Sequence, residues 1–121
     1  MKKIYIAGAY NANNVLSVLQ NMRKGIRLGT EVLLAGYSPF IPWLDYNVFL
    51  QLRENELISL DAIQSHSMEW LIVSDAVLLV PGWDNSKGTE AEIVKAAELK
   101  IPIFTSLGSM KEYFEIMEEE E

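Results

Sequence analysis

Apolar residues along the chain fall into two kinds of pattern. Four short runs are predominantly apolar, and between them lie longer stretches with apolar residues every three or four positions. The short runs are typical of strands buried on both faces, and the longer stretches are typical of amphipathic helices. The expected strands are residues 4–7, 37–41, 76–80 and 101–104. The expected helices are residues 15–35, 60–74 and 89–100 and a last helix after Ser106 or Ser109, with a helical excursion within 44–59.

The first helix carries features that predict how it packs. An apolar stripe follows one side, and Gly25 and Gly29 lie on that same side, which predicts a close approach to the sheet. An asparagine among residues 11–14 is expected to cap its start, and Gly36 fits the position that ends it. The stripe consists of Val15, Leu19, Met22, Ile26 and Leu33, with Val18 and Val32 beside them.

The alternation of strands and helices predicts an α/β fold. Helical crossovers between consecutive strands imply parallel pairing with right-handed connections. We therefore expect one domain over residues 1–121, a three-layer sandwich of the flavodoxin or Rossmann-like kind, with four or five parallel strands in the core order 2-1-3-4. Pro39 cannot donate a ladder hydrogen bond, so the second strand is expected at an edge.

The stretch from Asp75 to Phe104 is a strand–loop–helix–strand unit that carries most of the candidate chemistry. In open α/β sheets, ligands bind where the carboxyl end of a strand meets the start of the next helix. With the order 2-1-3-4, the ends of the first and third strands adjoin at that place. We expect one crevice there, in which Tyr5, Gly8 and Tyr10 face Ser86, Gly88 and Glu92.

The start of the helix in this unit allows two interpretations. Free N–H groups at a helix N-terminus attract anions, so Ser86, Gly88 and Thr89, with Lys87, can cradle a phosphate. Thr89 and Glu92 also have the spacing of a capping box, in which Glu92 bonds back to the Thr89 N–H. The alternative is that Glu92 points into the crevice as a nucleophile toward a sugar carbon.

Composition narrows the possible functions. Seventeen acidic against ten basic residues give a net charge of −7, which argues against a nucleic-acid polymer as partner. There is no cysteine, which excludes thiolate chemistry and disulfides. No metal-ligand cluster stands out, so neither a metal nor a cofactor is expected. No apolar run approaches the roughly 18 residues of a membrane span, and the start lacks a signal-peptide pattern, so we expect a cytoplasmic protein that binds no membrane.

Three segments resemble the nucleoside 2-deoxyribosyltransferase superfamily, which includes the deoxynucleoside 5′-monophosphate N-glycosidases. Residues 86–92, S-K-G-T-E-A-E, match its S- or D-x-G-x-x-x-E motif. Residues 5–8, Y-I-A-G, match the end of its first strand, and residues 69–76, E-W-L-I-V-S-D-A, match the passage into its third strand. The resemblance covers nearly the whole chain and is greatest to a short, little-characterised branch.

The resemblance implies an enzyme that cleaves the N-glycosidic bond of a deoxynucleoside or deoxynucleoside 5′-monophosphate, by hydrolysis or base transfer. Glu92 is then the nucleophile, and Tyr5 orients it. Ser67 stands where the family carries an aspartate that assists the leaving base, and His66 or Asp61 is a candidate substitute. The expected substrate-binding residues are Gly8, Ala9, Tyr10, Trp43, Trp83, Asp84, Ser86, Gly88 and Thr89.

Two other functions stay open. Residues 88–92 also fit G-T-x-x-E, which is similar to the phosphoribohydrolases that release cytokinin bases from ribonucleoside 5′-monophosphates, although their further glycine-rich loop and longer chain are missing. Ser67 in place of the aspartate suggests a nucleotide-binding module without turnover.

All of these functional hypotheses imply a small nucleoside or nucleotide as the ligand. Aromatic side chains offer stacking surfaces for its base, and short polar side chains can read the edge of the base. The family's usual assembly implies a homodimer or homotetramer. The candidates for stacking are Trp43, Trp83, Tyr10 and Phe40, and those for the edge are Asp45 and Asn47.

Overall fold

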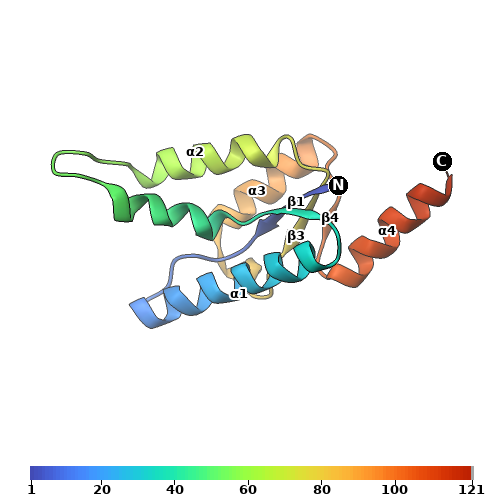
Figure 1. Cartoon of the computed structure of the whole chain (residues 1–121), viewed down its shortest axis with the longest axis horizontal. Helices are drawn as coiled ribbons and strands as arrows, with labels where there is room; N and C mark the ends of the chain where they lie inside the picture. Colours follow the sequence, from blue (N-terminus) through green and yellow to red (C-terminus); the bar gives the residue numbers. More distant parts are fainter. Residues whose placement is uncertain (121) are drawn as a thin grey trace.

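A parallel sheet forms the centre of the molecule (Figure 1). The structure is a computed structural model and describes residues 1–120. Within them the strand order is β2-β1-β3-β4, and each neighbouring pair is parallel. The predicted sheet, its order and the edge position of the Pro39 strand are confirmed. The strands are β1 Lys3–Ala7, β2 Ser38–Phe40, β3 Ala76–Leu79 and β4 Ile103–Phe104.

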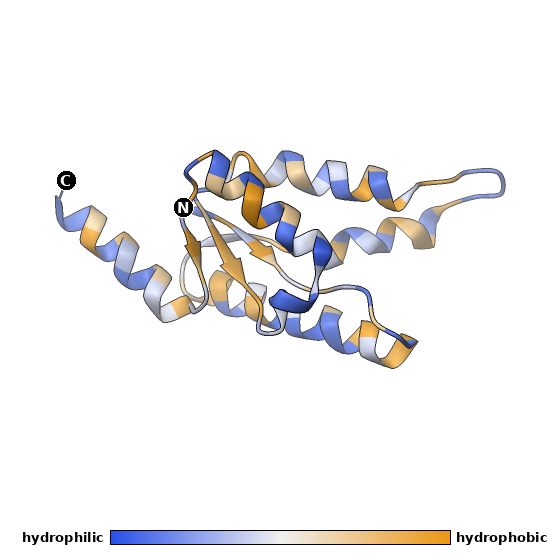
Figure 2. Ribbon diagram, turned by 180° about the vertical axis from the view of Figure 1, so that it is seen from behind, coloured by the Kyte–Doolittle hydropathy of each residue, from blue (hydrophilic) through white to orange (hydrophobic). Residues whose placement is uncertain are grey.

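Helices cover both faces of the sheet, which confirms the three-layer sandwich. Because successive strand residues point to opposite faces, Ile4 and Ile6 belong to the core under α1 and α4, whereas Tyr5 and Ala7 face α2 and α3. Figure 2 shows the hydrophobic strands between helices whose surfaces are mixed or hydrophilic. The α-helices are α1 Val15–Leu34, α2 Leu60–Leu71, α3 Lys87–Glu98 and α4 Leu107–Glu120.

An arm extends beyond the carboxyl ends of the strands (Figure 1). It consists of the 3-10 helix η1 Pro42–Gln51 and α2, joined by residues 52–59. The helical excursion expected within 44–59 is therefore confirmed only as far as Gln51. Beyond it, Asn55 adopts a left-handed conformation with φ of 71° and the Glu56 N–H bonds back to the Arg53 carbonyl, so the chain turns.

The predicted ends of α1 are confirmed, but its predicted apolar stripe is partly wrong. Asn14 accepts a hydrogen bond from the Ser17 N–H at 2.8 Å, and Gly36 follows the helix with φ of 95°. The buried residues of α1 are Gly25, Gly29 and Val32. The first turns of α1, which carry Val15 and Leu19, run past the sheet (Figure 1). The exposed members of the stripe are Val15, Leu19 and Leu33.

The two glycines of α1 permit a close approach, but not to the strands themselves. A Cβ at Gly25 would lie 2.3 Å from the Trp43 ring, and a Cβ at Gly29 would lie 2.4 Å from Ile41 Cδ1. The helix therefore packs against the chain that leaves β2 for η1. This contact fixes Trp43, which is 3% exposed, at the base of the arm.

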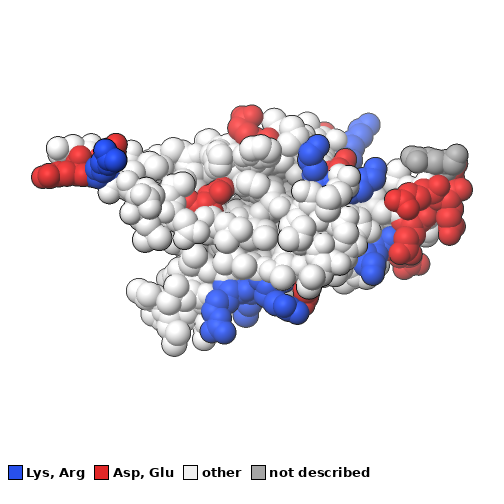
Figure 3. All heavy atoms as spheres, in the orientation of Figure 1, with Lys and Arg blue, Asp and Glu red and all other residues white. Residues whose placement is uncertain are grey.

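Charged side chains are unevenly distributed over the surface (Figure 3). Basic side chains lie along α1, whose sequence includes Arg23, Lys24 and Arg27, and the end of α4 is acidic. Much of the face between the arm and α1 is uncharged in this view. Among residues 1–120, no helix combines the length and apolar character that crossing a membrane requires.

Candidate functional site

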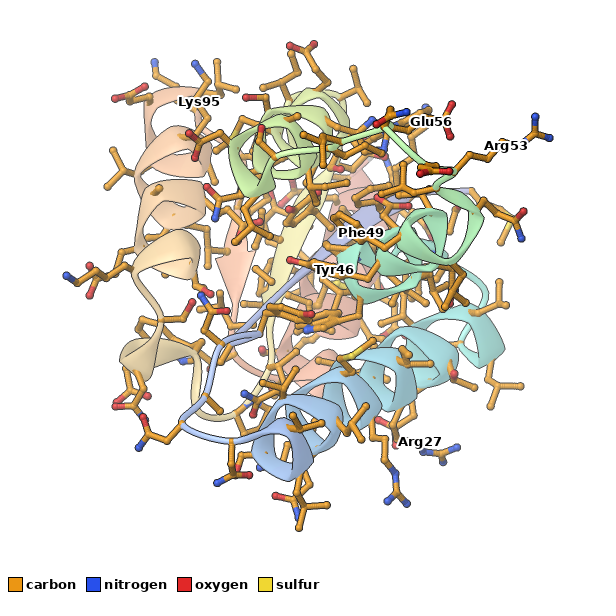
Figure 4. All side chains as sticks on the ribbon, turned by 90° about the vertical axis from the view of Figure 1, so that its left-hand side faces the viewer. Arg27, Tyr46, Phe49, Arg53, Glu56 and Lys95 are labelled. Carbon is orange, nitrogen blue, oxygen red and sulfur yellow. The ribbon has the colours of Figure 1, made fainter. Side chains whose placement is uncertain are left out.

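A cavity of about 460 Å³ lies at the carboxyl ends of β1 and β3, between the arm and the start of α3. The expected crevice is confirmed, because residues from both sides of it line this one cavity. Figure 4 looks along the molecule from the arm, and Tyr46 of η1 extends toward the interior, whereas Arg27 and Arg53 point away. The six residues expected to face one another there, Tyr5, Gly8, Tyr10, Ser86, Gly88 and Glu92, all line it.

β1 positions Tyr5 in the cavity wall. Its side chain points to the α2 and α3 face of the sheet, and the residue is 1% exposed. The Phe40 ring stacks on it with centroids 5.5 Å apart, which holds the phenol from behind. Glu92 of α3 and Ser67 of α2 line the same cavity as Tyr5, and both lie close enough to affect the pKa of its hydroxyl. β1 thus places one hydroxyl near two helices.

The start of α3 decides between the two interpretations of Glu92. The helix begins at Lys87, and the Ser86 hydroxyl accepts a hydrogen bond from the Thr89 N–H at 3.2 Å. The capping box that pairs Thr89 with Glu92 is therefore wrong, since Ser86 already bonds that N–H. Glu92 lies one turn further on, lines the cavity and interacts with Tyr5.

Burial sets the protonation of this pair. It raises the pKa of Glu92 from 4.5 to about 7, against the opposing effect of the nearby Tyr5 hydroxyl. Burial also raises the pKa of Tyr5, and the charge of Glu92 adds to the effect. Tyr5 therefore stays protonated, while Glu92 is divided between its two forms near neutral pH.

Aromatic rings frame another part of the cavity. Tyr10, from the loop after β1, and Tyr46, from η1, stack with centroids 4.0 Å apart and planes 2° apart. Burial raises the pKa of Tyr46, with the charges of Tyr10, Glu92 and Asp45 adding to it. Nothing in the sequence singled out Tyr46, because residues 44–59 show no clear hydrophobic period, and their aromatic content was the one signal. Tyr46 and Tyr10 form a flat apolar surface in the wall.

The arm and the loops contribute further wall residues that the sequence did not single out. Gln64 of α2 lies opposite the start of α3, since its Nε2 would be 4.0 Å from a Cβ at Gly88. The part of the cavity near Ser86 and Lys87 is therefore lined by the Gln64 side-chain amide as well as by the start of α3. The other unselected wall residues are Ile6, Asn11, Pro42, Leu60, Ile63, Met68 and Asn85.

Four of the expected binding residues lie outside the cavity wall. The Ala9 carbonyl accepts a hydrogen bond from the Trp43 indole at 3.1 Å. Trp83 packs against the core between the sheet and α3, and Asp84 is exposed. Thr89 is fully buried, and within the described part of the chain its Oγ1 has no hydrogen-bond partner. None of the four lines the cavity, so a role for them in binding stays a prediction.

Of the other residues expected to stack on a base or to read its edge, some line the cavity and some do not. Trp43 lines the cavity, but its packing on Gly25 makes it a fixed wall. Phe40 is stacked between Tyr5 and Trp70, away from the lumen. The Asn47 side chain donates to the Leu44 carbonyl at 2.9 Å, within its own helix. Of the stacking candidates, Tyr10 and Trp43 line the cavity.

The candidates for the missing aspartate do not reach the cavity wall. Ser67 lines it, but His66 and Asp61 do not. His66 Nε2 lies 3.3 Å from Asp45 Oδ2, so this pair joins α2 to η1 beside the wall. In residues 1–120 the titratable side chains that line the cavity are Tyr5, Tyr10, Tyr46, Lys87 and Glu92.

Comparison with known proteins identifies a family for the chain but no activity. Residues 2–105 match the model of a family described as "Domain of unknown function (DUF4406)". No curated protein matches the chain.

Proposed function

The chain belongs to the DUF4406 family, and we propose that it cleaves the N-glycosidic bond of a deoxynucleoside or deoxynucleoside 5′-monophosphate. The observation that carries this proposal is the proximity of Tyr5 and Glu92, which line one cavity and affect each other's pKa. A buried carboxyl group near a hydroxyl, in a cavity that also has a helix start and aromatic rings in its wall, suits a ligand with a sugar, an anionic group and a planar base.

The cavity offers a place for each part of such a ligand. The helix start at Ser86, Lys87 and Gly88 provides N–H groups and one cation for a 5′-phosphate or a 5′-hydroxyl. The Tyr10 and Tyr46 rings provide an apolar plane for the base. Glu92 lines the same cavity, so its carboxylate is available to the sugar that joins the two groups. The size of the cavity, about 460 Å³, is within the range of small-molecule sites.

The proposed reaction uses Glu92 twice. Its carboxylate stabilises the oxocarbenium-like sugar and then bonds to the anomeric carbon as the bond to the base nitrogen breaks. The base takes the electron pair of that bond and a proton. Water then attacks the same carbon, releases the Glu92 carboxylate and gives the free sugar, while a second base in place of water gives transfer.

A binding module without turnover is the second candidate, and one observation favours it. Among the cavity-lining residues of the described chain, Glu92 is the sole carboxylic acid, and no histidine joins it. Departure of a base is helped by a proton from a positioned acid. If Glu92 acts as the nucleophile, the departing base must take its proton from a tyrosine or from water.

Base release measured by chromatography distinguishes the candidates. We expect release from deoxynucleosides or their 5′-monophosphates and no release by Glu92→Gln, with Glu90→Gln as a control on the exposed side of the same helix. Release confined to ribonucleoside 5′-monophosphates would indicate a phosphoribohydrolase instead. Binding of these substrates without release of base would support the nucleotide-binding module. Release by Glu92→Gln at the wild-type rate would show that Glu92 is not the nucleophile.

Further details of the proposal need their own measurements. A new nucleoside formed on addition of a free base would show a transferase rather than a hydrolase. The expected homodimer or homotetramer is tested by light scattering on the eluting protein, and a monomer would contradict it. The resemblance to the nucleoside 2-deoxyribosyltransferase superfamily and the cytoplasmic location stay predictions.

A further inference from the structure

The second half of α4 extends beyond the body of the molecule (Figure 1, Figure 2). Met110 and Phe114 of this helix are buried in the core. Tyr113, Ile116 and Met117 are 37%, 49% and 41% exposed, and their spacing places them on one side of the helix. The apolar surface of α4 therefore continues past the part that the core covers.

The same part of α4 is strongly acidic. The helix holds five glutamates and one lysine, and it ends in Glu118, Glu119 and Glu120. Helical spacing places Glu120 on the side that carries Ile116 and Met117. None of residues 107–120 lines the candidate site, so the proposed function gives this acidic and apolar surface no role.

An open groove lies between α1 and the residues directly after β3. It shares no lining residue with the candidate site. Ile26 and Leu28 of α1 contribute apolar side chains to its wall, and so do Val80 and Pro81 after β3. The groove therefore offers an apolar surface on the opposite side of α1's contact with the sheet edge from the arm's cavity wall only in chemical terms: it can receive apolar side chains that the candidate site does not use.

Basic side chains line the α1 side of the groove. Arg23, Lys24 and Arg27 have the spacing of one side of a helix, and all three are exposed. Arg27 Nε lies 3.3 Å from Glu31 Oε1, so part of this positive charge is already paired. The whole chain has ten basic residues, and three of them within two turns of α1 make a concentrated positive site on an acidic protein. Figure 3 shows the basic side chains along α1 and the acidic ones at the end of α4.

We propose that the groove binds the second half of α4 from a second copy of this chain. An amphipathic helix binds by laying its apolar side into an apolar groove, and opposite charges around the contact fix its partner and its register. Tyr113, Ile116 and Met117 then cover the apolar wall, and the terminal glutamates face the basic side of α1. The helix of the same copy is held in its own core and lines no part of the groove, so a second copy has to supply it.

Reciprocal exchange closes this contact into a dimer. When each of two copies supplies its α4 and receives that of the other, both exposed helix surfaces are covered and the contact area is twice that of one-way docking. One-way docking leaves a free helix at one end and a free groove at the other. We therefore expect a two-fold dimer, and this inference does not rest on the proposed function.

Charge exchange between the two surfaces tests the proposal on the whole chain, with the oligomeric state measured by sedimentation velocity over a range of concentrations. Arg23→Glu with Lys24→Glu makes the groove acidic, and Glu119→Lys with Glu120→Lys makes the end of α4 basic. Either double variant alone should raise the dissociation constant of the dimer by about tenfold or more, because like charges then meet. An equimolar mixture of the two should form a heterodimer at the wild-type affinity, because both of its contacts join opposite charges again.

Two further variants separate the local contact from overall charge. All four substitutions in one chain keep the wild-type net charge and should restore the homodimer. Arg53→Glu with Lys95→Glu changes the net charge as much as the groove variant does, at positions outside the groove (Figure 4), and should leave the affinity unchanged.

An apolar variant tests the other half of the contact. Met117→Glu places a charge on the apolar side of α4 and should also raise the dissociation constant by about tenfold or more. A wild type that stays monomeric at every concentration would overturn the proposal and leave the groove to a different acidic partner. A dimer that Met117→Glu does not weaken, or a mixture of the two charge variants that stays monomeric, would overturn it as well. None of these measurements uses base release, so they decide the role of α4 even if the proposed function fails.

Discussion

Replacing Glu92 by glutamine removes a charge that the fold buries at a cost in stability. The pKa of Glu92 is about 7 in the folded chain and 4.5 without the fold. The difference of about 2.5 pH units corresponds to roughly 3 kcal/mol, reduced to the extent that water in the cavity solvates the carboxylate. Glu92→Gln keeps the size of the side chain and removes this penalty, so the variant should be more stable than the wild type wherever Glu92 is ionised.

The pH dependence of the gain follows from the sign of the shift. Because the folded pKa is raised, the folded chain holds the proton more tightly than the unfolded chain, and the penalty is fully present above about pH 7. It fades as the pH falls from about 7 to 4.5, where both forms are protonated. The gain in Glu92→Gln should therefore be greatest at pH 8 and almost absent at pH 4.5.

Urea unfolding of the wild type and Glu92→Gln, followed by tryptophan fluorescence at pH 5 and pH 8, measures this difference. Glu90→Gln, on the exposed first turn of α3, corrects for the loss of one negative charge from an acidic chain. The reasoning is refuted if the gain at pH 8 is no larger than at pH 5, or if Glu90→Gln shows the same gain as Glu92→Gln.

Three further predictions test the packing and the cavity wall. Gly25→Ala should destabilise the fold by about 1 to 3 kcal/mol in urea unfolding, because its Cβ would lie 2.3 Å from the Trp43 ring. Gly108→Ala in α4 meets open space and should be neutral or stabilising, and equal effects of the two would contradict the contact. Thr89→Val should raise stability by about 1 kcal/mol, since a buried hydroxyl without a partner is replaced by a methyl group, and a loss would indicate a hidden partner. Tyr46→Ala should weaken binding of a deoxynucleoside monophosphate in calorimetry by about tenfold, the equivalent of about 1.4 kcal/mol from lost stacking, whereas unchanged affinity would remove Tyr46 from the site.

The fold was predictable because local patterns agreed with the global arrangement. The apolar run ending at Val80 required a strand covered on both faces, and Pro39 required an edge. Given the strand order, the ends of β1 and β3 had to adjoin, so Tyr5 and Glu92 could be brought together without any contact information. The sequence separation of Tyr5 and Glu92 does not by itself indicate that they are close in space.

What the sequence did not reveal depends on contacts between distant segments. The Thr89 and Glu92 spacing fits a capping box, but the Ser86 hydroxyl accepts the same N–H. It can do so because the 3-10 turn Trp83–Asn85 ends just before Ser86 and α3 begins at Lys87. Val15 belongs to a regular helical stripe, yet the sheet ends before it. Tyr46 stacks on Tyr10 across more than thirty residues of chain, within a segment that has no clear period.

The pH dependence of base release bears most directly on Glu92 as a buried nucleophile. Measured as kcat/KM on the substrate that the panel identifies, release by the wild type should rise from pH 5 to pH 8 with a midpoint near the Glu92 pKa of about 7, and Glu92→Gln should show none at any pH. A profile that is flat across this range, or release by Glu92→Gln at the wild-type rate, would contradict it.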